Sequence, residues 1–201
     1  MPKDTFFNLP EAKRKIVLDA AIDEFAEYPF SKASVGRIIE RAGIASGSFY
    51  QYFEDKLDLY SHIMQTIQEK KMKIMYPIVG QSPEKGFFEL FRSLYEAGIR
   101  FLRENPKLEA VGGHFFRDKE LLNRHLKEYE PAAMDFYRIL LIRGIKAGDI
   151  REDLDLERVS YFLFKLGVAL NEYIFEKGTF SSYDTETVDS MLEFIRSGIG
   201  K

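Results

Sequence analysis

The sequence of 201 residues contains no cysteine and only three histidines, His62, His114 and His125. Without cysteine there is no disulfide framework, no thiolate zinc site and no cysteine nucleophile. The three histidines do not have the spacing of a zinc-binding pair. The sequence also lacks a nucleophile elbow. It has no complete P-loop, because Gly112–His114 lacks the lysine and hydroxyl that a phosphate loop requires. We therefore expect no metal site, no cofactor and no enzymatic activity.

Long apolar runs are scarce as well. The most apolar stretch, residues 161–175, is interrupted by Lys165, Asn171 and Glu172. It is therefore shorter than the roughly 18 continuous apolar residues that a membrane span needs. Residues 1–7 have no apolar core typical of a signal peptide. We expect a cytoplasmic protein that does not cross a membrane, and the lack of disulfides fits a reducing compartment.

The chain has little excess charge of either sign. It carries 29 basic and 32 acidic residues, for a net charge of −3. Because 45% of its residues are hydrophobic and 30% are charged, it has enough apolar side chains to fold around a core. Composition alone gives no indication of nucleic-acid binding, so any such indication must come from local pattern.

Runs of alternating β-branched residues are absent, whereas apolar residues recur at spacings of three and four. The pattern predicts an all-α protein with about nine helices. In the first of them Ile16, Ala20, Ala21 and Phe25 form the apolar stripe. Proline and glycine positions predict a break at Tyr76–Pro77 and residues 80–83, and Pro131 marks a candidate kink. The expected helices cover residues 10–28, 34–42, 45–52, 55–75, 87–104, 108–116, 119–147, 156–176 and 185–199.

The character of the helices changes at Asp55. Helices before this residue are short, and those after it are long and rich in aromatic residues. We therefore expect an N-terminal three-helix DNA-binding head over residues 1–54 and a larger bundle for ligand binding and dimerisation over residues 55–201. No internal repeat or low-complexity tract suggests a further division.

Two short helices of the head have the pattern of a helix-turn-helix. Ser34 can cap the first, and Gly43 suits the left-handed position that ends it. A seam made of Ile38, Ala42, Ile44 and Phe49 can hold the second helix at an angle, as in proteins that place it in the DNA major groove.

The outward side of this second helix carries hydroxyl and amide groups, which bind phosphates and base edges. No carboxylate lies between Arg41 and Phe53 to repel DNA. The head as a whole is not basic, with eight basic and nine acidic residues over 1–56. From spacing alone, two short helices whose aromatic residues fill a core remain an alternative. The candidate DNA-binding residues are Ser34, Arg37, Ser46, Gly47, Ser48, Tyr50, Gln51, Tyr52 and Lys56.

Residues 28–60, YPFSKASVGRIIERAGIASGSFYQYFEDKLDLY, resemble the N-terminal signature of TetR-family transcriptional regulators. The stretch from Arg143 to Asp155 is similar to a recurrent segment of that family's regulatory domain. The resemblance implies that Ser46–Tyr52 forms the recognition helix, that Tyr50 touches phosphate and that Lys56 anchors the following helix. Two positions depart from the family pattern: Ala33 replaces the usual threonine, and Ile39 replaces a small alanine.

The bundle has more apolar surface than one core face explains. The helix after Asp155 carries two apolar stripes, and in TetR-like proteins the last two helices form a four-helix dimer interface. The residues expected at that interface are Tyr161, Phe164, Val168, Phe175, Val188, Met191, Leu192 and Ile195.

Aromatic residues with a few polar groups also suit a pocket for a largely apolar molecule. The alternative for His114 is a partly buried histidine with its hydrogen bonds satisfied, and aromatic stripes also occur as plain core. The residues expected to bind such an effector are Phe88, Phe91, Tyr95, His114, Phe115, Phe136, Tyr137 and Asn171.

Together these features predict a homodimeric transcriptional repressor that binds double-stranded operator DNA and is released by an apolar or amphipathic small-molecule effector. A helical carrier of hydrophobic small molecules without a DNA function is the alternative from another class, and a helical-bundle enzyme is a third. The carrier needs no paired recognition helices, and the enzyme needs a reactive constellation that the sequence lacks.

Overall fold

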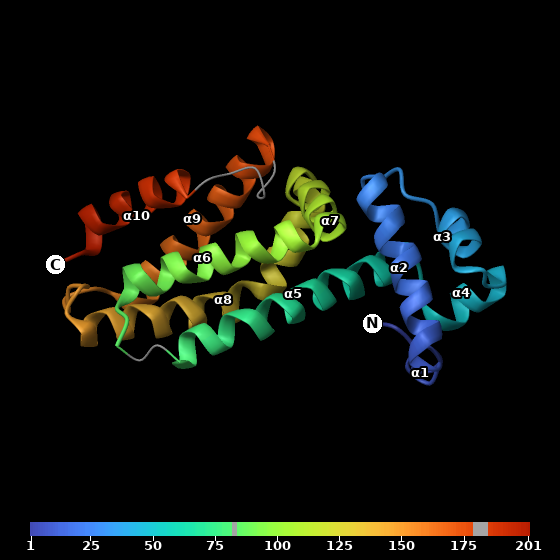
Figure 1. Ribbon diagram of the computed structural model, residues 1–201, viewed down its shortest axis with the longest axis horizontal. Coiled ribbons are helices and arrows are strands. Elements are labelled where there is room, and N and C mark those ends of the chain that lie inside the picture. The colour runs from blue at the N-terminus through green and yellow to red at the C-terminus, as the bar shows by residue number, and fades with distance from the viewer. Residues whose placement is uncertain (82–83, 179–184) are drawn as a thin grey trace. The chain divides into compact units, whose positions relative to one another are not determined.

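The computed structural model describes residues 1–81, 84–178 and 185–201 (Figure 1). Over these ranges the chain forms ten α-helices, and a single isolated bridge, Ile150 with Gly200, takes the place of any strand. This confirms the all-α class. The helices are α1 Asp4–Phe7, α2 Glu11–Glu27, α3 Val35–Ala42, α4 Ser46–Tyr52, α5 Lys56–Gln81, α6 Phe87–Glu104, α7 Pro106–Arg117, α8 Lys119–Ala147, α9 Leu156–Lys177 and α10 Glu186–Ile199.

The chain divides into two compact units. The first contains residues 1–72 and 105–115, and the second contains residues 73–104 and 116–201. This division differs from the expected boundary at residues 54 and 55, because the first half of α5 is part of the first unit. Leu59, Tyr60 and Ile63 of that helix are buried, each at most 1% exposed.

Short helices in the first unit are held by their caps and by aromatic side chains. Ser34 caps α3, accepting a hydrogen bond from the Arg37 backbone N–H, and Gly43 ends α3 with φ of +62°. This left-handed conformation strains any residue with a Cβ, so a glycine fits the turn between α3 and α4. Phe49 and Phe53 are fully buried beside it. The predicted caps and seam are therefore present.

Helix α2 buries a slightly different stripe from the expected one. Val17 is buried, whereas Ile16 is 52% exposed. Neighbouring residues on a helix lie about 100° apart, so a shift of one position moves a side chain from the core to the surface.

Two prolines lie inside helices, so the break predicted at Tyr76–Pro77 is wrong and α5 continues to Gln81. Pro131 likewise lies within an uninterrupted α8. Both prolines are exposed. A proline removes one backbone hydrogen bond, and water can satisfy the freed carbonyl on an exposed face. The rest of the expected 80–83 break includes residues 82 and 83, which lie outside the described ranges.

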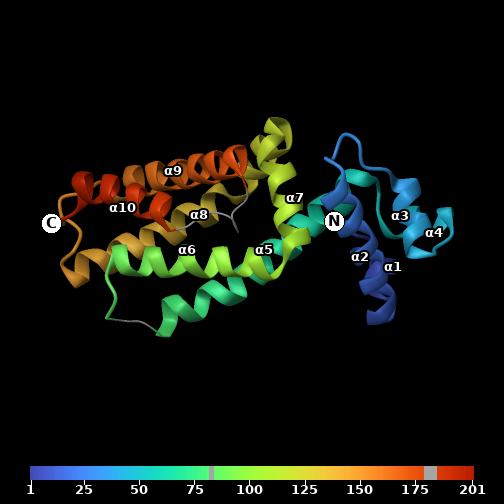
Figure 2. The same ribbon diagram turned by 45° about the horizontal axis from the view of Figure 1, so that its top comes forward.

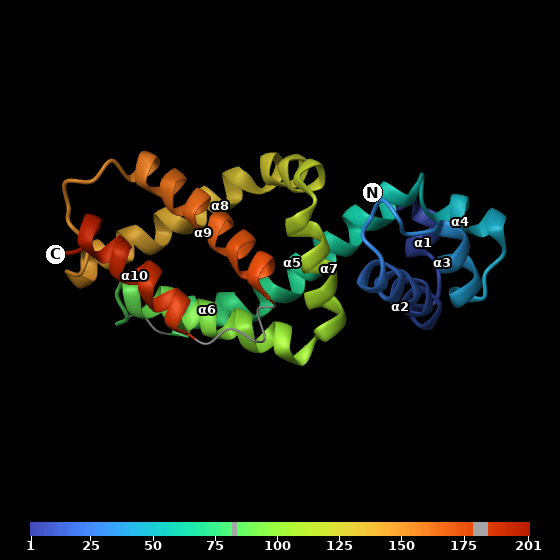
Figure 3. The same cartoon turned by 90° about the horizontal axis from the view of Figure 1, so that it is seen from above.

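The second unit is a helical bundle, seen from two further directions in Figures 2 and 3. Helix α8 packs against α9 and α6, and α10 packs against α6. Its core contains aromatic and aliphatic side chains from all four helices, including Phe87, Leu140, Ile174 and Leu192. This unit therefore has the continuous apolar interior that the sequence predicted for residues after the head.

Candidate nucleic-acid interface

Helix α4 has an exposed polar side and a buried apolar side. Ser46, Gly47 and Gln51 are exposed, and Tyr50 is 57% exposed. Phe49, on the opposite side, is fully buried. Positions 46, 47, 50 and 51 lie on one side of a helix because they are one, three, four or five positions apart. The face offers hydroxyl, phenol and amide groups to a polyanion, without a carboxylate.

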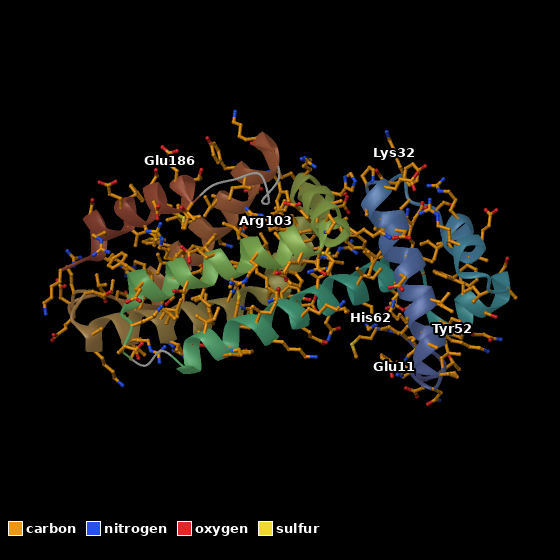
Figure 4. The ribbon with its side chains drawn as sticks, in the orientation of Figure 1. Glu11, Lys32, Tyr52, His62, Arg103 and Glu186 are labelled. Atoms are coloured by element: carbon orange, nitrogen blue, oxygen red, sulfur yellow. The ribbon has the colours of Figure 1, made fainter. Side chains whose placement is uncertain are left out.

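Two residues expected on this face lie closer to the core. Ser48 is half-buried, and the half-buried Tyr52 ring, labelled in Figure 4, lies 6.1 Å from the Phe6 ring of α1. The same ring is 6.4 Å from Phe53. Tyr52 therefore packs against Phe6 and Phe53 on the inner side of α4 and does not lie on its outward side.

Arg37 is held by a buried carboxylate rather than extended into solvent. Glu24 on α2 has no exposed surface, and it accepts hydrogen bonds from Arg37 Nε at 2.9 Å and Nη2 at 2.5 Å. It also accepts from the Ser34 backbone N–H at 2.7 Å. Hydrogen bonding to Glu24 raises the pKa of Arg37 above its usual value. The Arg37 guanidinium further lies 4.2 Å from the centre of the Tyr28 ring, so this residue ties α2 to the start of α3.

Lys56 has a similar structural task. Its half-buried ammonium donates to the carbonyl oxygens of Phe30 at 2.7 Å and Ala33 at 2.9 Å, and it lies 4.5 Å from the centre of the Phe30 ring. An ammonium has three donors, so two are committed to the loop before α3. Lys56 therefore fixes this loop to α5, and one donor remains for a phosphate.

Residues near the N-terminus hold the end of α4, a role that the sequence did not indicate. The Lys3 backbone N–H donates to the Tyr52 carbonyl at 2.9 Å, and Lys3 Nζ donates to the Tyr50 carbonyl at 2.8 Å. The Thr5 hydroxyl donates to the Gln51 carbonyl. The last carbonyls of a helix have no partner within the helix, so these three contacts satisfy them. We call Lys3 and Thr5 the N-terminal clamp.

The residues expected to bind an effector fall into both units. Phe88, Phe91, Tyr95, Phe136, Tyr137 and Asn171 belong to the second unit, whereas His114 and Phe115 belong to the first. His114 Nε2 lies 3.3 Å from the Ala26 carbonyl oxygen of α2, the arrangement of a satisfied histidine. Phe115 is buried.

Within the second unit, the Tyr95 ring stacks on Phe91 at 5.0 Å, and Tyr137 lies 6.2 Å from Phe91. Asn171 donates to the Gly167 carbonyl at 2.8 Å. The Phe136 ring lies 6.2 Å from the Tyr137 ring. The Arg196 guanidinium carbon lies 3.9 Å from the centre of the Phe88 ring.

Most residues expected at a dimer interface are buried within their own unit. Tyr161 is exposed and Val168 is half-buried, but the other six are at most 8% exposed. Apolar periodicity marks both stripes of a helix and does not tell which of them its own bundle covers. The residues that the structure places in the core are Phe164, Phe175, Val188, Met191, Leu192 and Ile195.

Other apolar side chains on the last two helices are exposed instead. Phe162 is 58% exposed, Tyr173 is 48% exposed and Phe194 is 72% exposed. Over the described ranges no helix combines the length and apolar content of a membrane span, and no three histidine or acidic side chains gather in a way that could hold a metal ion.

Comparison with known proteins agrees with this geometry. Residues 17–63, from α2 into α5, match the family described as bacterial regulatory proteins, tetR family. The chain belongs to the TetR family. It is a DNA-binding transcriptional regulator, and its helix-turn-helix consists of α3 and α4. Regulators of this family are not enzymes, which confirms that expectation.

Three relatives cover nearly the whole chain. The fatty acid metabolism regulator protein of Bacillus subtilis is 24% identical over 91% of this chain and 93% of its own length. The crystal structure of a TetR family transcriptional regulator from Chloroflexus aurantiacus is 27% identical, covers 100% of this chain and 99% of its own, and has a TM-score of 0.62. FadR from Bacillus subtilis in complex with stearoyl-CoA is 24% identical, covers 92% and 98%, and has a TM-score of 0.70.

Proposed function

We propose that this TetR-family regulator is a homodimeric repressor that reads its operator through α4 and is released by an apolar or amphipathic effector. The observation that supports DNA binding is the exposed polar face of α4. This face has no carboxylate, and the buried Phe49 ring on the opposite side fixes the helix. In this proposal Ser46 and Tyr50 bind phosphates, and Gln51 reaches a base edge. Lys3 and Lys56 add positive charge beside the same backbone while they hold the head together.

Operator binding by α4 variants tests this part. We expect Tyr50→Phe to weaken binding about equally for all sequences, because it removes a hydroxyl donor to phosphate. Gln51→Ala is expected to change the preferred base more than the general affinity. Tyr76→Phe is the matched control, because Tyr76 is 63% exposed but lies on α5. Fluorescence anisotropy with selected operator fragments measures all three, and unchanged isotherms for both α4 variants would contradict the assignment.

The exposed aromatic side chains of α9 and α10 support the proposed homodimer. A single two-turn recognition helix reads few base pairs, and helix-turn-helix dimers read two half-sites. Phe162→Glu and Phe194→Glu place a charge where we expect the partner. Phe164→Glu would instead test stability, because Phe164 is in the core of its own unit. We expect ultracentrifugation to show a dimer for the unmodified protein and a larger monomer fraction for the two exposed variants, and a stable monomer at micromolar concentration would contradict the proposal.

The effector part rests on the aromatic cluster of the second unit. An apolar lining with few polar groups suits a largely apolar ligand. Two relatives bear names connected with fatty acids or acyl-CoA, which makes a fatty-acyl compound a candidate effector here. If effector and operator compete for different states of the dimer, each weakens the binding of the other by the same factor, typically 5- to 150-fold. Because a regulator of this kind acts on chromosomal DNA, we also propose a cytoplasmic location.

A further inference from the structure

Two tyrosines of the second unit direct their hydroxyls to one point on a third helix. Tyr95 lies on α6, Tyr137 on α8 and Gly167 on α9. A Cβ atom added to Gly167 would lie 2.5 Å from the Tyr137 hydroxyl oxygen and 3.7 Å from the Tyr95 hydroxyl oxygen. The missing side chain of Gly167 therefore leaves the room that the Tyr137 hydroxyl occupies. Three helices that are distant in sequence together build this arrangement.

Neither hydroxyl has a hydrogen-bond partner among residues 1–81, 84–178 and 185–201, and each hydroxyl oxygen keeps some exposed surface. Burial raises the pKa of Tyr137 to about 12 and raises the pKa of Tyr95 well above its usual value. Both phenols are therefore protonated at neutral pH and act as hydrogen-bond donors. A donor in apolar surroundings costs free energy until an acceptor reaches it.

The polar side chains that flank Gly167 on α9 already have partners. The Asn171 amide is committed to the Gly167 carbonyl. Lys165, two residues before Gly167, has its ammonium on Glu130 at 2.6 Å. A free carboxylate would therefore lose its hydration here without gaining an ion-pair partner from these groups. A carbonyl oxygen has two lone pairs and no charge, so it suits two neutral donors.

We propose that Tyr95 and Tyr137 form a paired donor that binds the neutral carbonyl oxygen of an otherwise apolar effector, such as an ester, thioester or amide, in preference to a free acid. This inference rests on the proposed effector function and names the chemistry of its ligand. Phe91, stacked on Tyr95, supplies part of the apolar surface that the rest of the ligand would contact.

Displacement of the dye Nile red from the full chain tests the proposal at pH 7.5. The competing probes are methyl decanoate, decanoate and undecane, which present an ester carbonyl, a carboxylate and no acceptor. The variants are Tyr95→Phe, Tyr137→Phe and the double variant. Tyr76→Phe is the matched control, because it removes the same hydroxyl from an exposed position on α5 in the same unit.

We expect the unmodified protein and Tyr76→Phe to bind methyl decanoate at least about 10-fold more tightly than either other probe. Each single Phe variant should lose about 5- to 10-fold of its affinity for the ester, the effect of one hydrogen bond, and keep its affinity for undecane. The double variant should bind ester and alkane almost equally.

Three results would overturn the inference. If decanoate binds most tightly, or if the double variant keeps the ester preference, the unit binds apolar compounds but the tyrosines do not choose among them. In both cases the proposed effector role survives. If none of the three probes displaces the dye or binds, the proposed apolar effector is contradicted together with this inference.

Discussion

The two units of the chain differ in the polar side chains that their proposed functions use. In the first unit, Glu24, Arg37 and Lys56 are half-buried or buried and bind partners on neighbouring segments. In the second unit, the hydroxyls of Tyr95 and Tyr137 and the buried Ser160 hydroxyl have no such partner among the described residues. A network with its bonds made holds one geometry, whereas unpaired donors are available to a ligand. Glu24, Arg37 and Lys56 therefore help to hold the first unit in one geometry, whereas the Tyr95 and Tyr137 hydroxyls are available to an effector.

The largest effect on stability is expected at Glu24, because its loss breaks the hydrogen bonds to Arg37 and to the Ser34 backbone. Glu24→Gln removes the charge that faces Arg37 and weakens the hydrogen bonds that Glu24 accepts from Arg37 and from the Ser34 backbone. Removing one partner of a buried pair costs about 3–5 kcal/mol, and we expect about 2 kcal/mol here because Arg37 is 40% exposed on its side chain. Asp19→Asn on the same helix is the control, because its pair with Lys15 is exposed and contributes less than about 1 kcal/mol. Urea unfolding measures both, and equal losses would show that the network is not a special feature of this unit.

The N-terminal clamp is the next test of a fixed α4. Lys3→Met and Thr5→Val leave two helix-end carbonyls without their donors, and each lost hydrogen bond is expected to cost about 1 kcal/mol. Hydrogen exchange should become faster in α4 while α6 stays unchanged, and operator affinity should fall. Lys13→Met is the control for the lost charge, because Lys13 is an exposed lysine of α2. If the Lys3 and Lys13 variants lose operator affinity equally and α4 exchange is unchanged, the clamp does not position the helix.

Gly47→Ala separates stability from DNA binding within α4. No atom lies within 4 Å of the position that its Cβ would take. Alanine favours a helix interior over glycine by about 0.5–1 kcal/mol, and Gly47 lies in the first turn of α4, so the melting temperature should rise by less than an interior substitution would give. The added methyl lies on the exposed face, so operator affinity should fall at the same time. A variant that is both more stable and equally tight on operator would show that DNA does not approach this face closely.

The smallest effect concerns acidification of the first unit. His62, labelled in Figure 4, packs its ring on Phe6 at 5.7 Å and Phe7 at 6.0 Å, and burial lowers the pKa of its imidazole. The unfolded chain therefore binds the proton more readily near pH 6.5, so stability is complete above that pH and declines as pH falls toward the folded pKa. Thermal melts at pH 7.5 and 5.5 should show a smaller decrease for His62→Gln than for the unmodified protein. Equal decreases would assign the acid sensitivity to other groups.

The helix-turn-helix could be predicted from the sequence because its signals are local. Ser34 and Gly43 act on the helix between them, and the Phe49 seam is set by helical spacing. Glu24 could not be predicted as a buried residue, because its partner Arg37 lies thirteen positions away and a carboxylate on a helix normally faces water. The clamp involves contacts 46 and 47 positions apart and a four-residue helix with no periodicity to detect.

The bundle was predicted less completely for a related reason. Apolar spacing identified α9 and α10 but could not tell that Phe164 faces the core while Phe162 faces outward. Likewise, the sequence marked Tyr95 and Tyr137 as aromatic residues near a ligand, yet only the close approach at Gly167 shows that both hydroxyls lie near the same point on α9. Such contacts depend on how three helices pack together and leave no local signal.

The most direct measurement is selection and sequencing of DNA fragments bound by the purified protein from a random-sequence pool. We expect enrichment of an inverted repeat whose half-sites are separated by about one helical turn, roughly 34–36 Å, or a multiple of it. The same pool selected with Gln51→Ala should return a changed base within each half-site. Recovery of fragments with no shared sequence would contradict the claim that α4 reads an operator.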